Sequence, residues 1–196
     1  MNEAAQADIG TWVFWGVAIA GLLYAVLIYN NLVTLKHQVT KSWSNIDVLL
    51  KQRHEELPKL VETCKQYMNF EQETLEKVML ARAAAQTARD RGDVKGVGAA
   101  ESQMRLGLGQ LFAVAENYPE LKANQSFQQL QARISGLENA IADRREFYNE
   151  AVNINNVRIE QFPDVLIARG FNFGAADLLE FSATELEDPD IKSLFA

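Results

Sequence analysis

The most continuous apolar stretch of this chain lies near its N-terminus, where TWVFWGVAIAGLLYAVLIY runs from Thr11 to Tyr29 without a charge. The uncharged window around it extends from Ile9 to Leu35. About 20 helical residues cross a bilayer core about 30 Å thick. A helix inside a soluble protein seldom stays apolar on every side for so long. The pattern therefore predicts one transmembrane helix over residues 11–29, preceded by a short tail of residues 1–10.

Beyond this stretch the apolar residues recur at spacings of three and four, which is typical of helices with one buried face. These stripes predict four further helices, at Asn30–Leu57, Lys59–Arg89, Ala99–Tyr118 and Gln125–Phe162. Nothing between Tyr29 and Leu35 interrupts a helix, so we expect the membrane helix to continue into the body of the protein.

We therefore expect an all-α protein, in which the transmembrane helix continues into a long antiparallel up-and-down bundle of about four helices. A short C-terminal helix is expected at Ala175–Phe181. The bundle would occupy residues 30–173, and an acidic, partly ordered tail would occupy residues 174–196. The apolar residues of the tail are expected to fold back on the bundle. They are Phe171, Phe173, Leu178, Leu179 and Phe181, with possible docking by Ile191, Leu194 and Phe195.

Turn residues indicate where the helices are separated. Pro58 removes one helical hydrogen bond, and HEELPKL contains no Gly, Asn or Asp, so the pattern fits either a kink or a reversal of the chain. Three glycines, Gly92, Gly96 and Gly98, predict the clearest loop.

The segment YPELKAN reads as a short irregular connection. Pro119 should move Tyr118 out of helical geometry, and either Asn124 or Ser126 could cap the helix that follows.

Three polar residues, Arg144, Asn155 and Arg158, fall on the apolar track of the Gln125–Phe162 helix. They would either make polar contacts inside the bundle or mark a drift of the stripe onto its neighbours Phe147, Ile154 and Ile159. We favour the drift.

Charge sets the expected orientation of the membrane helix. All 19 Lys and Arg residues lie at or after Lys36, whereas the N-terminal flank carries Glu3 and Asp8. The positive-inside rule then places the N-terminus outside and the body in the cytoplasm. A cleaved signal peptide would show a basic start, which is missing here. The residues that mark the span are Thr11, Trp12, Trp15, Gly16, Gly21, Tyr24 and Tyr29, with the tryptophans at the outer interface and Tyr29 at the inner one.

Composition narrows the possible partners. The net charge is −7, and removing Glu3 and Asp8 leaves −5 for the body, which argues against nucleic-acid binding. The single cysteine, Cys64, excludes an intrachain disulfide and suits a reducing cytoplasm. No neighbouring His or Asp would activate it, so we interpret Cys64 as a small apolar residue on a helix face.

Catalytic and cofactor motifs are missing from the sequence. Neither His37 nor His54 follows a Glu by three residues, as a di-iron bundle requires. Two histidines and one cysteine do not form a zinc set, and no GxxxxGK[ST], GxSxG or GxGxxG is present. We expect no enzyme, no metal and no cofactor, with a polar contact at His54 to the backbone that Pro58 loosens.

Three blocks of sequence resemble the LemA family, and together they cover roughly residues 29–173 in the family's order. They are YNNLVTLKHQVTKSWSNIDVLLKQRHEELPKLVETCKQY, AVAENYPELKANQSFQQLQ and RREFYNEAVNINNVRIEQFPDVLIARGFNF. The matching positions are Trp43, Asp47, Arg53 and Pro58, then Glu116, Tyr118, Pro119, Leu121, Lys122, Asn124 and Phe127, then Arg145, Tyr148, Asn149, Phe162 and Pro163.

The resemblance implies a bacterial inner-membrane protein with its N-terminus outside and a cytoplasmic helical bundle. It implies no enzymatic activity, and a related domain occurs in a protein needed to form magnetosome membranes. We expect a scaffold that self-associates as a homo-oligomer and organises membrane lipid. The alternative is an adaptor that docks a protein partner through the corner Glu116–Asn124.

Overall fold

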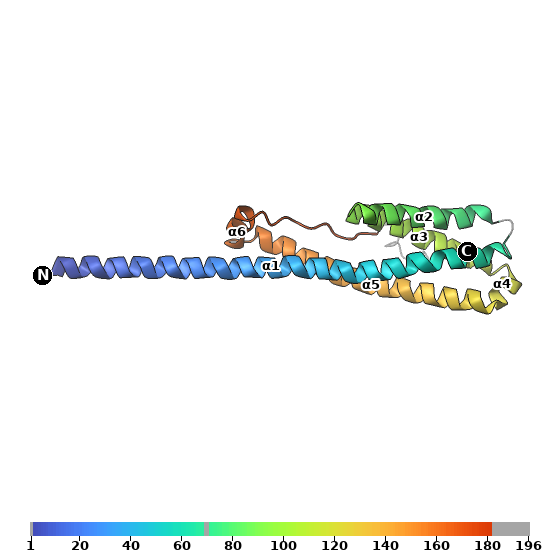
Figure 1. The fold of residues 1–196 in the computed structure, drawn as a ribbon, viewed down its shortest axis with the longest axis horizontal. Helices are drawn as coiled ribbons and strands as arrows, with labels where there is room; N and C mark the ends of the chain where they lie inside the picture. Colours follow the sequence, from blue (N-terminus) through green and yellow to red (C-terminus); the bar gives the residue numbers. More distant parts are fainter. Residues whose placement is uncertain (1, 69–70, 182–196) are drawn as a thin grey trace, which may run out of the picture. The chain divides into compact units, whose positions relative to one another are not determined.

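A computed structural model describes residues 2–68 and 71–181 of the chain, with side chains from residue 10 onward. Its helices are α1 (Asn2–Lys65), α2 (Gln72–Asp90), α3 (Val94–Ala115), α4 (Pro119–Ala123), α5 (Gln125–Glu160) and α6 (Asp164–Gly170), as Figure 1 shows. The described residues contain no strand, so the all-α prediction is confirmed.

The chain forms two compact units. Within the described residues, the bundle unit contains Ser42–Asn149 together with Asp177–Phe181, and the anchor unit contains Asn2–Lys41 together with Glu150–Ala176.

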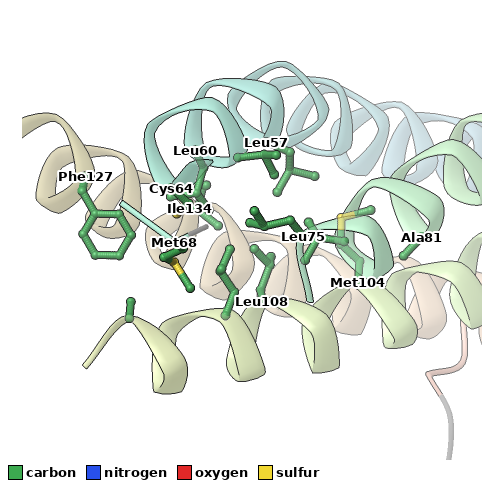
Figure 2. Close-up of a cluster of buried hydrophobic side chains, with 14 of the residues drawn as sticks. Leu57, Leu60, Cys64, Met68, Leu75, Ala81, Met104, Leu108, Phe127 and Ile134 are labelled. Atoms are coloured by element: carbon green, nitrogen blue, oxygen red, sulfur yellow. The ribbon is translucent and has the colours of Figure 1, made fainter. Parts of the chain in front are cut away.

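The bundle unit is organised around one apolar core. Buried side chains from α1, α2, α3 and α5 converge in it, and Figure 2 shows how they face one another. Its largest fully buried members include Leu57, Leu60, Met104, Leu108, Phe127 and Ile134. These residues belong to the stripes predicted from the sequence, because a spacing of three and four places apolar residues on one buried face of a helix.

Pro58 lies inside α1 and does not reverse the chain. The reversal comes later, after α1 ends at Lys65, where the amides of Tyr67 and Met68 donate to the carbonyl of Cys64 at 3.0 and 2.8 Å. The prediction of one helix over Lys59–Arg89 was therefore wrong. Residues on both sides of the turn are buried in the same core. The apolar spacing of three and four therefore continues across the turn, and the sequence reads as one helix.

The expected glycine loop is shorter than predicted. Only Gly92 has the positive φ of a turn, at 68°, and α3 already begins at Val94. The Asp93 side chain caps this helix by accepting from the amide of Gly96 at 2.9 Å. Gly96 and Gly98 thus belong to the first turns of α3, which corrects the loop prediction.

The segment after α3 is also more regular than expected. Pro119 opens the short helix α4, where its missing amide removes no hydrogen bond, and Tyr118 is non-helical as predicted. Asn124 rather than Ser126 caps α5, because the Asn124 Oδ1 accepts from the amide of Phe127 at 3.0 Å.

The short helix near the C-terminus is α6, and residues 173–181 are not helical. The prediction of a helix at Ala175–Phe181 was therefore wrong. Asparagine side chains of α5 satisfy the backbone of this segment instead. In the bundle unit, Asn149 accepts from the Leu179 amide at 2.9 Å and donates to its carbonyl at 3.1 Å. In the anchor unit, Asn156 makes the same two contacts with Ala176 at 2.9 Å each.

Of the five apolar tail residues expected to fold back, Leu179 is buried, Phe173 packs against an apolar cluster and the Phe181 ring centroid lies 4.1 Å from the Arg145 guanidinium, whereas Phe171 and Leu178 stay exposed. Ile191, Leu194, Phe195 and most of the acidic tail lie outside the described residues.

Two of the three polar residues on this α5 track, Asn155 and Arg158, make polar contacts, whereas Arg144 is exposed and lies 5.8 Å from the centroid of the exposed Phe147 ring. Asn155 is buried and donates to Asn156 at 3.1 Å, and Arg158 forms an ion pair with Asp164. Phe147 and Ile154, onto which the stripe was expected to drift, are exposed. Only Ile159 packs against an apolar cluster, in the anchor unit.

Candidate functional site

The apolar run of α1 is exposed over almost its whole length. The predicted membrane residues Thr11, Trp12, Trp15, Gly16, Gly21 and Tyr24 are all exposed, and a Cβ placed on Gly16 or Gly21 would meet nothing within 4 Å. Within the described residues, one helix, beginning at Gly10, is long and apolar enough to cross a membrane. These features fit a membrane anchor.

The C-terminal end of this run is covered within the anchor unit. Ile28 and Leu32 are buried against Ala168 of α6, with Ile159, Ile167 and Phe173 packed around them. The Tyr29 ring lies 4.9 Å from the ring of Phe171 and 5.7 Å from that of Phe173, centroid to centroid.

In the bundle unit, the family-motif residues of α1 contact three other helices. The Trp43 ring lies 5.4 Å from the Tyr148 ring on α5. Asp47 accepts from Arg89 on α2 at 2.8 and 2.9 Å and pairs with Lys51 at 2.7 Å. Burial alone would raise the pKa of Asp47, but the hydrogen bonds from Lys51 and Arg89 hold it below its ordinary value of 3.8.

The buried centre of this network is Arg53, which is only 3% exposed. Its guanidinium pairs with Glu101 of α3, which is also buried, and lies 3.7 Å from Glu138 of α5. Burial lowers the pKa of Arg53 to about 10, with Glu138 opposing the shift, so the side chain stays charged at neutral pH. An arginine in this position links α1, α3 and α5 in one arrangement, because every alternative would leave a charge buried without its partner.

Pro58 is accommodated by a long-range hydrogen bond. Without an amide on Pro58, the His54 carbonyl has no helical donor. The Nε of Arg82 on α2 donates to this carbonyl at 2.9 Å. The loosened backbone thus does make a polar contact, but with Arg82 of α2, whereas the expectation had been a contact made by His54 itself. Burial, together with Arg82 and Arg89, lowers the pKa of His54 below its ordinary value of 6.5.

The corner Glu116–Asn124 is held together mainly by packing and capping. Leu121 is buried, Tyr118 packs against the core, and Asn124 caps α5 while donating to the Tyr67 hydroxyl at 3.1 Å. Glu116 and Lys122 form an exposed ion pair. The corner thus presents a few polar groups on a rigid frame.

The residues near the C-terminal end of the family motif divide between the two units. Tyr148 donates from its hydroxyl to the Asp177 carbonyl at 2.8 Å, and burial raises the pKa of this phenol. Asn149 binds Leu179, as described above. Phe162 is strongly exposed, and the bond between Phe162 and Pro163 is cis.

Cys64 is fully buried, and burial raises the pKa of its thiol to about 12. This supports its interpretation as a small apolar core residue. Within the part of the chain that the structure describes, no three His, Cys, Asp or Glu side chains gather in a way that could hold a metal ion.

A groove of about 680 Å³ runs along the face of the bundle unit formed by α2 and α3. Small residues line much of it, among them Ala81, Ala84, Ala99, Ala100 and Gly107, and the polar residues Lys77, Gln103 and Gln110 line it as well. Leu80 on α2 is 69% exposed and Leu106 on α3 is 46% exposed at its sides. We did not predict this site from the sequence, although both leucines lie off the apolar stripes of their helices.

Comparison with known proteins gives one family match and several relatives. The model of the LemA family matches residues 42–192. The magnetosome proteins MamQ 1 and MamQ 2 of Paramagnetospirillum magneticum are each 23% identical to this chain in an alignment of 168 positions that covers 74% of the chain. The match spans 62% of the length of these relatives. Protein LemA of Metamycoplasma hominis is 27% identical over 184 residues, which cover 92% of this chain and 81% of the relative.

Proposed function

This chain belongs to the LemA family and is a membrane-associated helical protein, and from this premise we propose that it is a non-enzymatic scaffold that self-associates and organises or remodels the membrane. It would be a single-pass protein of the bacterial inner membrane, with its N-terminus outside and its bundle in the cytoplasm. The acidic N-terminal flank and the Lys and Arg residues that begin at Lys36 support this orientation. Its resemblance to magnetosome proteins supports a role in membrane organisation by analogy only.

The observation that carries the self-association is the groove between α2 and α3. The surface of the groove is mainly apolar, although Lys77, Gln103 and Gln110 also line it, and apolar surface favours a partner because water is released when it is covered. The small residues that line the groove let a helix of a second copy approach closely. Leu80 and Leu106 can then fill the matching groove of that copy. A two-fold contact of this kind uses the same patch on both subunits.

The test is to replace Leu80 and Leu106 by glutamate in the full-length protein. We expect the double variant to be monomeric in nanodiscs or mild detergent by light scattering, whereas the unchanged protein forms oligomers. Val48→Glu is the matched control, since Val48 is an equally exposed aliphatic residue on α1 of the bundle unit. A monomeric unchanged protein, or a double variant with undiminished assembly, would refute the groove as the contact.

The membrane effect needs its own measurement. Vesicles carrying the protein should change shape in electron microscopy when it assembles, and the double variant should leave them spherical. If assembly persists while vesicle shape never changes, the scaffold is an assembly without remodelling activity.

A second candidate function is an adaptor that docks a protein partner through the corner Glu116–Asn124. The rigid frame of Leu121 and Asn124 supports it, because preorganised polar groups lose little entropy on binding. Exchanging the charges in Glu116→Lys and Lys122→Glu keeps the frame, since both side chains are exposed. If a co-purifying partner is lost with this exchange and retained with Glu73→Lys, at an exposed position of α2, the adaptor is favoured over the scaffold.

A further inference from the structure

Three large apolar side chains are exposed at and beside the short helix α6. Phe162 is 81% exposed, Leu166 is 61% exposed and Phe171 is 62% exposed. Single exposed apolar residues are common on soluble proteins, but two phenylalanines and a leucine within ten residues form a patch that water solvates poorly. This patch is part of the anchor unit and lies outside the groove and the charge network described above.

The depth of this patch follows from the contacts of α6 with α1 in the same unit. Ile167 and Ala168 pack on Ile28 and Leu32, and Phe171 lies against Tyr29 at 4.9 Å between ring centroids. Figure 1 shows α6 beside this part of α1.

The span Thr11–Tyr29 measures roughly 28 Å along a helix, close to the roughly 30 Å of the hydrocarbon core. When the apolar run crosses the bilayer, Tyr29 lies at its boundary, and α6 lies at the same level.

The charges of residues 161–173 also fit a position at the boundary of the hydrocarbon core. Residues 161–173 carry only two charges, Asp164 and Arg169. Asp164 is buried and paired with Arg158, so its carboxylate does not face the surroundings. Arg169 is exposed, and arginine at a membrane surface pairs with phosphate and with anionic headgroups. The outer surface of α6 therefore presents apolar side chains and one cation.

We propose that α6 is a second membrane contact, in which Phe162, Leu166 and Phe171 insert between the phospholipid headgroups of the leaflet where α1 leaves the bilayer. Arg169 then pairs with lipid phosphate. The occupant is the lipid surface itself, because the patch is continuous with the end of the membrane-spanning run. A second contact fixes the rotation of α1 about its own axis, and its wedge of side chains adds volume to one leaflet. The inference rests on the membrane anchor in the proposed function, and it does not depend on self-association.

The test uses single cysteines labelled with the fluorophore NBD in the full-length protein, reconstituted into vesicles of phosphatidylethanolamine and phosphatidylglycerol. One set of vesicles carries bromine on the acyl chains near the headgroups, where it quenches the label by contact. Leu166→Cys and Phe162→Cys report on the patch. Cys64 can remain, because it is buried and its thiol pKa is about 12, so native labelling leaves it unmodified.

Two further positions make the outcomes distinguishable. Val17→Cys lies in the apolar run and reports whether α1 is in the bilayer at all. Val48→Cys lies in the bundle unit, is similarly exposed, and provides the unquenched reference. With bromine near the headgroups, we expect quenching at Leu166 and Phe162 to be several-fold above that at Val48. In a second set of vesicles, with bromine near the ends of the acyl chains, the label at Val17 should be quenched more strongly than with bromine near the headgroups.

Quenching at Val17 with none at Leu166 and Phe162 would overturn the second contact and leave the anchor intact. No quenching at Val17 would overturn both. A label at Leu166 that is blue-shifted but not quenched, with a blue shift that increases with protein density, would also overturn the second membrane contact. In that case a second copy of the protein would cover the patch.

Discussion

The Nε of Arg82 on α2 donates a hydrogen bond at 2.9 Å to the backbone carbonyl of His54, the carbonyl that Pro58 deprives of its helical donor. A proline thus stays inside a continuous helix because a side chain from the neighbouring helix replaces the lost bond.

Removing Arg82 should therefore destabilise the protein through Pro58. In Arg82→Met the His54 carbonyl loses its donor, and we expect a loss of about 1–3 kcal/mol. In a Pro58→Ala background residue 58 regains its amide, and the same change at Arg82 should cost clearly less. Thermal unfolding followed by circular dichroism in detergent measures both losses. Arg91→Met, at an exposed position just after α2, is the control, and equal costs in the two backgrounds would contradict the linkage.

The buried Arg53 should be intolerant of removal. Arg53→Met leaves Glu101 buried without its partner, and breaking a buried pair on one side costs about 3–5 kcal/mol. For a chain of this size the unfolding temperature should fall by roughly 6–20 °C.

Replacing Glu101 by Leu in the same chain should recover part of this loss, since the uncompensated charge is gone. Arg133→Met serves as the contrast, because its pair with Glu56 is largely exposed on the arginine side and should contribute about 1 kcal/mol or less. Similar losses at Arg53 and Arg133 would argue against a buried network.

Acid should weaken the contact between α1 and α2. The folded pKa of Asp47 lies below its ordinary value of 3.8, so the unfolded chain binds a proton there first as the pH falls. The stability from Asp47 is present above pH 3.8 and is lost as the pH falls through the lower folded pKa. Unfolding temperatures measured from pH 7 to pH 3 should fall more steeply for the unchanged protein than for Asp47→Asn. Parallel curves would show that the Arg89 pair contributes nothing to this slope.

A side chain at Gly98 should displace the segment after α6 from the bundle unit. A Cβ at this position would overlap the Glu180 carbonyl oxygen, a backbone atom that moves only with the segment itself. We expect Gly98→Ala to speed hydrogen exchange at the Leu179 amide, which donates to Asn149. Gly109→Ala is the matched control, because a Cβ there meets nothing within 4 Å and alanine favours the helix. Unchanged exchange in Gly98→Ala would place the segment farther from α3.

Cys64 should resist thiol reagents in the folded protein. Its sulfur is buried, and a pKa of about 12 leaves almost no thiolate at neutral pH. Ellman's reagent should react slowly in buffer and promptly after unfolding in guanidinium. Fast reaction of the folded protein would indicate that α1 opens locally near its C-terminal end.

The spacing of apolar residues by itself determined the all-α class, the membrane-spanning length and most of α5, because these features depend on which face of a helix is buried. The family resemblance, and not the spacing, pointed to Arg53 and Asp47, and it did not say what they contact. Tertiary structure alone decided that Pro58 stays in a helix, that Gly98 lies within α3 and that residues 173–181 are extended. At Pro58 and at Leu179 a backbone group finds its partner far along the chain, at Arg82 or at Asn149, whereas Gly98 lies within α3 because Asp93 caps that helix earlier than expected. The spacing of apolar residues predicts which residues are buried, whereas the tertiary structure determines which group a buried polar atom contacts.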